Sequence, residues 1–438
     1  MFQLIIWLGV LIILLMFCYY ISDNKILTPE LCYIAGFVPQ VLQAFFYIQE
    51  WNLNLSYATL LVLIEGGVLF VLASFLSGRF FRCMKTRKSY RHSACLYSLD
   101  KKIMLVFTVF EALTVLLTAY FLISSYDTTL SRAIYLYRAQ YMVSYHGIDL
   151  EVVMPKILRL CRRITTAVGY FWAYLLMQRI VLNQKKGRGL IIINFILSVI
   201  NSFVSTGGRK GIFLLVITAL VDLYLIYGMH TGWKMKIKIK SMLKLIAFGF
   251  VFIGLFKYAG GVAGKTINLD FGDYLAMYLS APLKNLDLFI RKGNFGISDI
   301  SESASFAHLV QYLNARGFLN PYADAFRVNY HNGINLGNAY TTYFSYIHDY
   351  GYAGLAGFVI FSAVLCQFIF QKAKKNNAYN ISIYTIVYAY LFSNLVFGFF
   401  SNFFITSVFD MTLVWNIIVW VIMSKLIKIR LYFGIKEI

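Results

Sequence analysis

This sequence has few charged residues. Asp, Glu, Lys and Arg together make up 13% of its 438 residues, about half of the roughly 25% that is typical of soluble domains. Hydrophobic residues make up 60% of the chain and aromatic residues 18%. So few charges cannot cover a surface that faces water. This composition excludes a soluble enzyme, a coiled coil and a disordered protein, and it predicts a polytopic membrane protein.

The cysteines are few and show no pattern. They lie in or beside different apolar segments, without a CxxC pair and without the Cys–His spacing of a zinc site; they are Cys18, Cys32, Cys83, Cys95, Cys161 and Cys366. This excludes a disulfide-stabilised scaffold, and we expect no metal site. The first 21 residues are apolar, with no basic region and no small-residue cleavage site. We therefore predict a retained first helix and not a signal peptide.

Long apolar runs dominate the rest of the chain. A helix needs about 20 mostly apolar residues to cross a bilayer, and runs of about this length occur at 2–21, 31–48, 57–77, 103–124, 164–182, 190–205, 211–228, 244–260, 352–371, 380–400 and 408–427. They predict an all-α membrane protein with eleven transmembrane helices. Three regions follow: residues 1–256 with helices one to eight, an outward cap with short helices at 257–351, and the last three helices at 352–438.

Basic residues recur in every second loop between these runs, and the formal net charge is +21. Lys and Arg mark the cytoplasmic side of membrane proteins, and here they cluster within 78–102, 185–188, 234–244, 372–375 and 425–436. This predicts a cytoplasmic C-terminus and an N-terminus on the opposite side. Residues 125–163, the turn near 207–211 and the segment 257–351 then face outward.

The outward segments also contain many basic residues, against the usual rule. One interpretation is an anionic ligand at the outer leaflet, such as a lipid phosphate or pyrophosphate. The alternative is that long loops cross the membrane regardless of their charge, with nearby Asp and Glu residues offsetting part of it. We favour the ligand.

The turn Gly207-Gly208-Arg209-Lys210-Gly211 lies between two apolar runs and begins a predicted helix. Glycine lets the backbone approach a ligand closely, and a helix N-terminus attracts anions. With two cations beside it, this turn favours a phosphate group. The alternative is an ordinary turn whose Arg and Lys reach the membrane interface. The stretch 155–164 similarly predicts an amphipathic surface helix, which either anchors to headgroups or steers an anionic lipid.

Residues 338–354 are the most informative stretch. Aromatic and apolar side chains at helical spacing predict a short helix that leads to the bilayer surface, and His348 and Asp349 follow at the mouth of a span. Perturbed ionisable groups in such places are candidate site residues. Interfacial tyrosines and ordinary loop histidines are the alternative interpretation. The carboxylates Glu65, Glu111, Asp222 and Asp410 fall within apolar runs, where they either line a cavity or pair with polar groups at helix ends.

These features resemble the Wzy-type O-antigen and capsule polymerases. The likeness lies in the many-span layout, the outward GGRKG turn, and the late outward loop that exits through Asn338-x-x-Thr341 and Asp349-Tyr350-Gly351-x-x-Gly354. By motif it covers about the last half of the chain, and by topology the rest. The related O-antigen ligases begin the equivalent stretch with a His-Asn pair. Here Gly337 precedes Asn338, which favours the polymerase.

The resemblance implies a GT-C-like glycosyltransferase of the bacterial inner membrane. It would transfer a growing glycan from undecaprenyl pyrophosphate to a new lipid-linked repeat unit, with no metal, nucleotide sugar or nucleic acid, and with a chain-length regulator protein as a further partner. Cations would stabilise the leaving pyrophosphate and a base would accept the hydroxyl proton. We expect substrate-binding roles for Arg209, Lys210, Arg316, Arg327, Asn338, Tyr340 and His348, and a catalytic base in Asp349 or, second, His331.

Two other functions use the same lipid-linked ligand. A flippase or exporter would bind its headgroup in a basic cavity without chemistry, and an O-antigen ligase would differ from the polymerase in its acceptor. Pseudo-symmetric halves and cations along the membrane interior would favour the flippase. The sequence instead concentrates cations on one face beside a large outward loop, which favours the enzyme.

Overall fold

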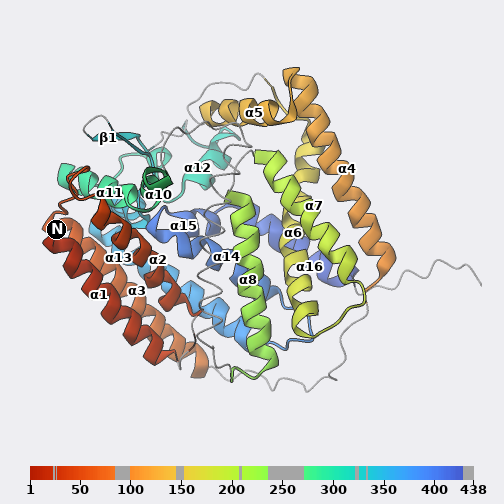
Figure 1. Cartoon of the computed structure of the whole chain (residues 1–438), viewed down its shortest axis with the longest axis horizontal. Helices are drawn as coiled ribbons and strands as arrows, with labels where there is room; N and C mark the ends of the chain where they lie inside the picture. The colour runs from red at the N-terminus through yellow and green to blue at the C-terminus, as the bar shows by residue number, and fades with distance from the viewer. Residues whose placement is uncertain are drawn as a thin grey trace, which may run out of the picture.

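The computed structural model describes residues 1–22, 25, 27–83, 99–144, 152–206, 210–234, 271–320, 325–331 and 334–427. These residues form an almost entirely helical protein (Figure 1). The helices are α1 (Phe2–Ile21), α2 (Pro29–Phe46), α3 (Tyr57–Cys83), α4 (Lys101–Tyr126), α5 (Leu130–Ser144), α6 (Lys156–Val181), α7 (Arg188–Thr206), α8 (Lys210–His230), α10 (Phe271–Leu279), α11 (Ala281–Lys292), α12 (Ala307–Asn314), α13 (Thr342–Lys374), α14 (Ile383–Leu395), α15 (Phe403–Val408) and α16 (Met411–Leu426). The short elements are the 3-10 turns η1 (Ile300–Glu302) and η2 (Val396–Phe399), and an antiparallel hairpin of β1 (Asn329–His331) and β2 (Ile334–Gly337).

Five of the described helices are long and apolar enough to cross a membrane, namely α1, α3, α4, α8 and α13. Shorter apolar helices occupy Arg188–Val204, Ile383–Phe399 and Met411–Leu426. The predicted spans at 31–48 and 164–182 correspond to α2 and α6, and the one at 244–260 lies outside the described residues. The predicted stretch 155–164 is the first part of α6 and continues into the span without a break. The all-α membrane class is therefore supported, and the number eleven stays a prediction.

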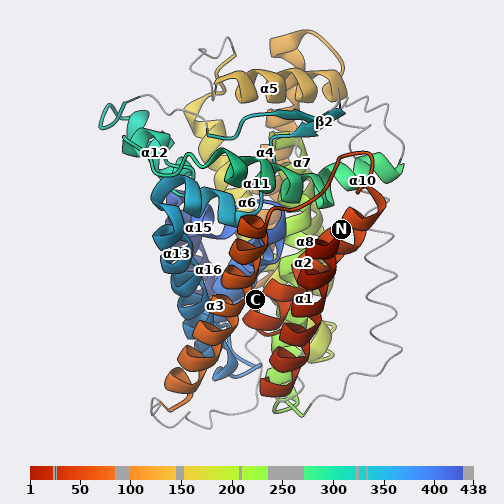
Figure 2. The same cartoon turned by 90° about the vertical axis from the view of Figure 1, so that its left-hand side faces the viewer.

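The elements of the predicted outward segment gather at one end of the helix bundle (Figure 2). We call α10, α11, η1, α12, β1 and β2 the cap. The helix ends that carry the basic clusters meet at the other end, where the Lys375 ammonium donates to the Phe81 carbonyl at 3.1 Å. There Gln178 also donates to the Ala378 carbonyl at 2.7 Å. The described helix ends that lead into the basic segments therefore lie opposite the cap, as the alternating charge pattern predicts.

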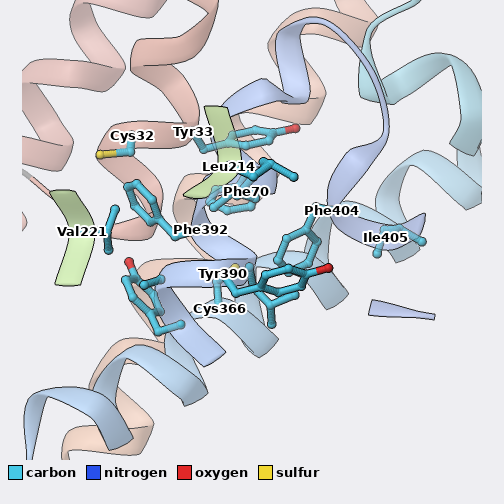
Figure 3. Packing of buried hydrophobic residues seen from close by; sticks show 14 of the residues in the cluster. Cys32, Tyr33, Phe70, Leu214, Val221, Cys366, Tyr390, Phe392, Phe404 and Ile405 are labelled. Atoms are coloured by element: carbon cyan, nitrogen blue, oxygen red, sulfur yellow. The ribbon is translucent and has the colours of Figure 1, made fainter. Parts of the chain in front are cut away.

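The interior of the bundle is apolar and rich in aromatic rings. Tyr33 of α2 stacks on Phe70 of α3, with the ring centroids 3.9 Å apart, and Phe37 stacks on Tyr343 at 5.5 Å. Figure 3 shows how side chains from α2, α3, α8, α13, α14 and α15 fill one interior. Buried aromatic rings of this size supply most of the apolar contact area in a core. This packing holds together the helix bundle on which the cap lies.

Helix α13 contains a sharp bend that divides it into an upper segment, 342–349, and a longer span. At Gly351 the backbone has φ +62° and ψ −154°, a conformation that only glycine adopts readily. The bend frees the carbonyls of His348 and Asp349, and the amides of Gly296 and Ile297 donate to them at 2.9 and 3.2 Å. The predicted short helix before the span is therefore present, and a cap loop closes its end.

The span predicted at 380–400 is interrupted. Helix α14 ends at Leu395, η2 follows, and the six-residue α15 begins only at Phe403. Backbone that leaves a helix at membrane depth must be buried in protein or line a polar site. At this break the buried Asn402 side-chain oxygen accepts from the hydroxyl of Tyr346 at 3.2 Å. The break therefore lies against the upper segment of α13.

Candidate functional site

Two Asp–His pairs lie where the cap meets the bundle, and the first joins neighbours in the sequence. The Nδ1 atom of His348 is 2.9 Å from the Asp349 carboxylate at the end of the upper segment of α13. The Asp349 side chain is fully buried, whereas 22% of the His348 side chain is exposed. The pair thus has one inaccessible group and one that solvent or substrate can reach.

The Asp349 carboxylate has four hydrogen-bond partners. Besides His348, it accepts from the Ser303 hydroxyl at 2.6 Å, the Ala304 amide at 2.9 Å and the Ser305 amide at 2.8 Å. These contacts satisfy both oxygens of the buried carboxylate. Asp349 consequently ties cap residues 303–305 to α13. The sequence alone gives no sign of these three donors.

Aromatic rings form a row beside this pair. Tyr340, Phe344 and His348 follow one another at four-residue spacing, with centroid distances of 4.1 and 5.4 Å, and Phe289 of α11 lies 6.1 Å from the His348 ring. Tyr340 is buried, and its hydroxyl accepts from Asn329 at 2.7 Å and donates to the Arg327 carbonyl at 3.1 Å. This expected glycan-orienting residue therefore holds the hairpin to α13.

The second pair joins residues that are far apart in the sequence. Nδ1 of His308, in α12, is 3.0 Å from the carboxylate of Asp410, which also accepts from the Thr412 amide and caps the N-terminus of α16. Burial would raise the pKa of Asp410, but the His308 and Thr412 contacts outweigh it and hold this pKa below its usual value. Asp410 also attracts Lys210 electrostatically.

Lys210 begins α8 at the cap end, as the GGRKG turn predicts. Its side chain is exposed, and the ammonium lies 3.6 Å from the centre of the Phe403 ring. Cations bind favourably over aromatic faces. Lys210, Asp410 and His308 therefore form a second polar group, in which sequence reasoning selected the lysine and passed over both partners as site residues.

The remaining predicted cations do not lie in this group. The Arg316 guanidinium stacks 3.4 Å from the centre of the Tyr312 ring in the cap, and Arg327 is exposed beside the hairpin. Asn338 is exposed after β2, and His331 belongs to β1, with its side chain outside the described parts of the structure. Arg209 also lies outside the described residues. The expected convergence of cations is thus not seen among the described candidates.

The carboxylates within apolar runs have different surroundings. Glu111 accepts from the Trp172 indole at 2.7 Å and the Ser198 hydroxyl at 3.1 Å, and so links α4, α6 and α7. Asp222 in α8 is fully buried, and within the described residues neither of its oxygens has a hydrogen-bond partner. Glu65 is exposed on α3. Asp410 pairs at a helix end, which was one of the two interpretations of the sequence.

In the described ranges, no three His, Cys, Asp or Glu side chains are arranged to hold a metal ion. No protein family model, curated protein or solved structure matches this chain. The arrangement of the site residues is therefore the basis for assigning a function.

Proposed function

We propose that this protein is a membrane glycosyltransferase that polymerises lipid-linked oligosaccharide repeat units into O-antigen or capsular polysaccharide. The observation that carries the proposal is that two polar groups, His348–Asp349 and Lys210–Asp410–His308, lie where a folded cap meets an apolar helix bundle. A polyprenyl tail suits apolar helices, while a glycan and its diphosphate need polar groups at the membrane surface. This arrangement offers both.

In the proposed reaction, a hydroxyl of a new repeat unit attacks the sugar carbon that joins the growing glycan to undecaprenyl pyrophosphate. The leaving diphosphate gains negative charge, which a positioned cation stabilises. Lys210 is the described cation with this role, and Arg209 precedes it in the sequence. The hydroxyl proton needs an acceptor, and the His348–Asp349 pair has that chemistry. In this proposal the cap faces the outside of the bacterial inner membrane and the C-terminus faces the cytoplasm.

Deleting the protein from its own bacterial host tests the proposal. Loss of a polymerase leaves single repeat units attached to the outer lipid, or on the lipid carrier in a capsule strain, because assembly stops after the first unit. Surface polysaccharide is then separated by size on gels, with the deletion complemented by the wild-type chain as the control.

The two alternative functions give other patterns. Without a ligase, no units are attached while long chains accumulate on the lipid carrier. Without a flippase, single units accumulate on the inner side of the membrane. Either pattern, or unchanged long chains in the deletion strain, would overturn the polymerase.

A further inference from the structure

We infer that the Nε2 atom of His348 is the proton acceptor of this reaction and that Asp349 is a positioning residue that acts through His348. The inference rests on the proposed function and deepens it. It reverses the roles that the sequence suggests for these two neighbours, in which Asp349 is the base and His348 orients the glycan.

The surroundings of Asp349 make it a poor base. Its hydrogen-bond partners are His348, Ser303, Ala304 and Ser305, so both oxygens are already engaged. Its side chain is also fully buried, and a sugar hydroxyl cannot reach it without displacing the cap loop. Neither oxygen is therefore open to a substrate hydroxyl.

The same bonds prepare His348 for the role. An ionised carboxylate can only accept hydrogen bonds, so Nδ1 of a neutral His348 carries its hydrogen toward Asp349 and Nε2 keeps a free lone pair. Within the described residues, Nε2 has no hydrogen-bond partner, and the side chain is 22% exposed. The rings of Phe289 and Phe344 flank the imidazole. Orientation by a buried Asp is how a histidine is held as a general base in hydrolase triads.

In this step His348 takes the proton that the acceptor hydroxyl loses. The acceptor hydroxyl oxygen forms a bond to the anomeric carbon of the donor sugar, and the bond from that carbon to the phosphate oxygen breaks. The electron pair of the broken bond leaves with undecaprenyl pyrophosphate. The hydroxyl proton passes to Nε2 of His348, and the imidazolium, beside the Asp349 anion, then releases it to water.

The test uses full-length protein reconstituted in vesicles with lipid-linked repeat units extracted from the deletion strain. His348→Ala should lower the polymerisation rate by about 100-fold or more, which is typical for loss of a general base, while KM for the lipid-linked units stays the same. Adding imidazole should restore part of the rate, because the small molecule fills the space and accepts the proton. His308→Ala is the matched control, since it removes the imidazole of the other pair, and its rate should not respond to added imidazole.

A double-mutant cycle assigns Asp349. If Asp349 acts through His348, Asp349→Asn slows the wild type by about 10-fold or more but slows His348→Ala little further, since residues that act as a unit are not additive. Fully additive losses, an unaffected His348→Ala variant, or a variant that imidazole does not rescue would each overturn the inference. Failure of the wild-type vesicles to lengthen the extracted units would instead overturn the proposed function, so the two failures are distinguishable.

Discussion

The two Asp–His pairs have nearly the same geometry and very different surroundings. Their nitrogen–oxygen distances are 2.9 Å for His348–Asp349 and 3.0 Å for His308–Asp410. The first carboxylate is fully buried, whereas 27% of the Asp410 side chain and 37% of the His308 side chain are exposed. An exposed ion pair contributes little to stability, while a buried hydrogen-bonded carboxylate is costly to disturb.

This difference indicates that the two pairs have different roles. The buried pair fixes one imidazole and one cap loop in place, so its loss should affect the stability of the fold and, in the proposed reaction, the proton acceptor. The exposed pair connects α12 of the cap to the start of α16 and places a carboxylate near Lys210. Substitutions at each pair can separate these roles.

The largest effect is expected from Asp349→Ala. This substitution leaves the Ala304 and Ser305 amides buried without their acceptor, and we expect the free energy of unfolding to fall by about 3–5 kcal/mol. Asp410→Ala is the matched control, and loss of a helix N-cap should cost about 1 kcal/mol. Thermal unfolding of the purified proteins in detergent measures both. Equal losses would contradict the comparison.

Gly354→Ala should come next. A Cβ atom at position 354 would overlap the carbonyl oxygen of Tyr346 and lie 2.7 Å from Cβ of Tyr350, so the two parts of α13 would be pushed apart. Overpacking of this kind costs about 1–3 kcal/mol. At Gly357, one turn further along, a Cβ atom would meet nothing within 4 Å. Gly357→Ala should therefore keep the wild-type unfolding temperature, and a similar drop in both variants would refute the close packing at the bend.

Lys210→Ala tests the second polar group without touching the first. Removing the ammonium should lower the polymerisation rate by about 10-fold through lost stabilisation of the leaving diphosphate. Because the side chain is exposed, the unfolding temperature should change little. Lys210→Arg keeps the charge and should retain most of the rate in the same vesicle assay. A loss of rate that is as large in Lys210→Arg as in Lys210→Ala would argue against a role for the charge.

The smallest effect is expected from lowering the pH, which should weaken the His308–Asp410 pair. The pKa of Asp410 is lower in the folded protein than its usual value, so its contribution to stability is present above about pH 4 and disappears as the pH falls through the folded pKa. Wild-type protein should therefore lose slightly more thermal stability between pH 7 and pH 3 than Asp410→Asn, by about 1 kcal/mol or less. Equal losses in the two proteins would rule out this contribution.

The sequence could predict those parts of the fold that depend on local pattern. Apolar runs located the long helices, and the spacing before His348 predicted the short helix above a span. The end of α14 at Leu395 could not be predicted, because residues 396–400 are as apolar as the rest of the predicted span. Alternating charge correctly predicted which helix ends lie together, since that rule depends only on the order of the loops.

The candidate site was predictable only where its members are neighbours in the chain. His348 and Asp349 are adjacent, so the sequence displays them as a pair. His308 and Asp410 are separated by 102 residues, and their contact depends on how α12 packs near α16. The sequence also could not show the surroundings of Asp349, because the donors from 303–305 reach it only through the tertiary fold.

The bend in α13 has a mechanical consequence. The carbonyls of His348 and Asp349 accept hydrogen bonds from residues 296–297, and the Asp349 carboxylate accepts from the amides of residues 304–305. The upper segment of α13 and the cap loop 296–305 therefore move together. Helix α12 begins two residues after this loop and is also held to the bundle by the His308–Asp410 pair, whose side chains are partly exposed. In the proposed reaction, a lipid carrier that approaches from the bilayer would therefore meet a rigid surface at this point.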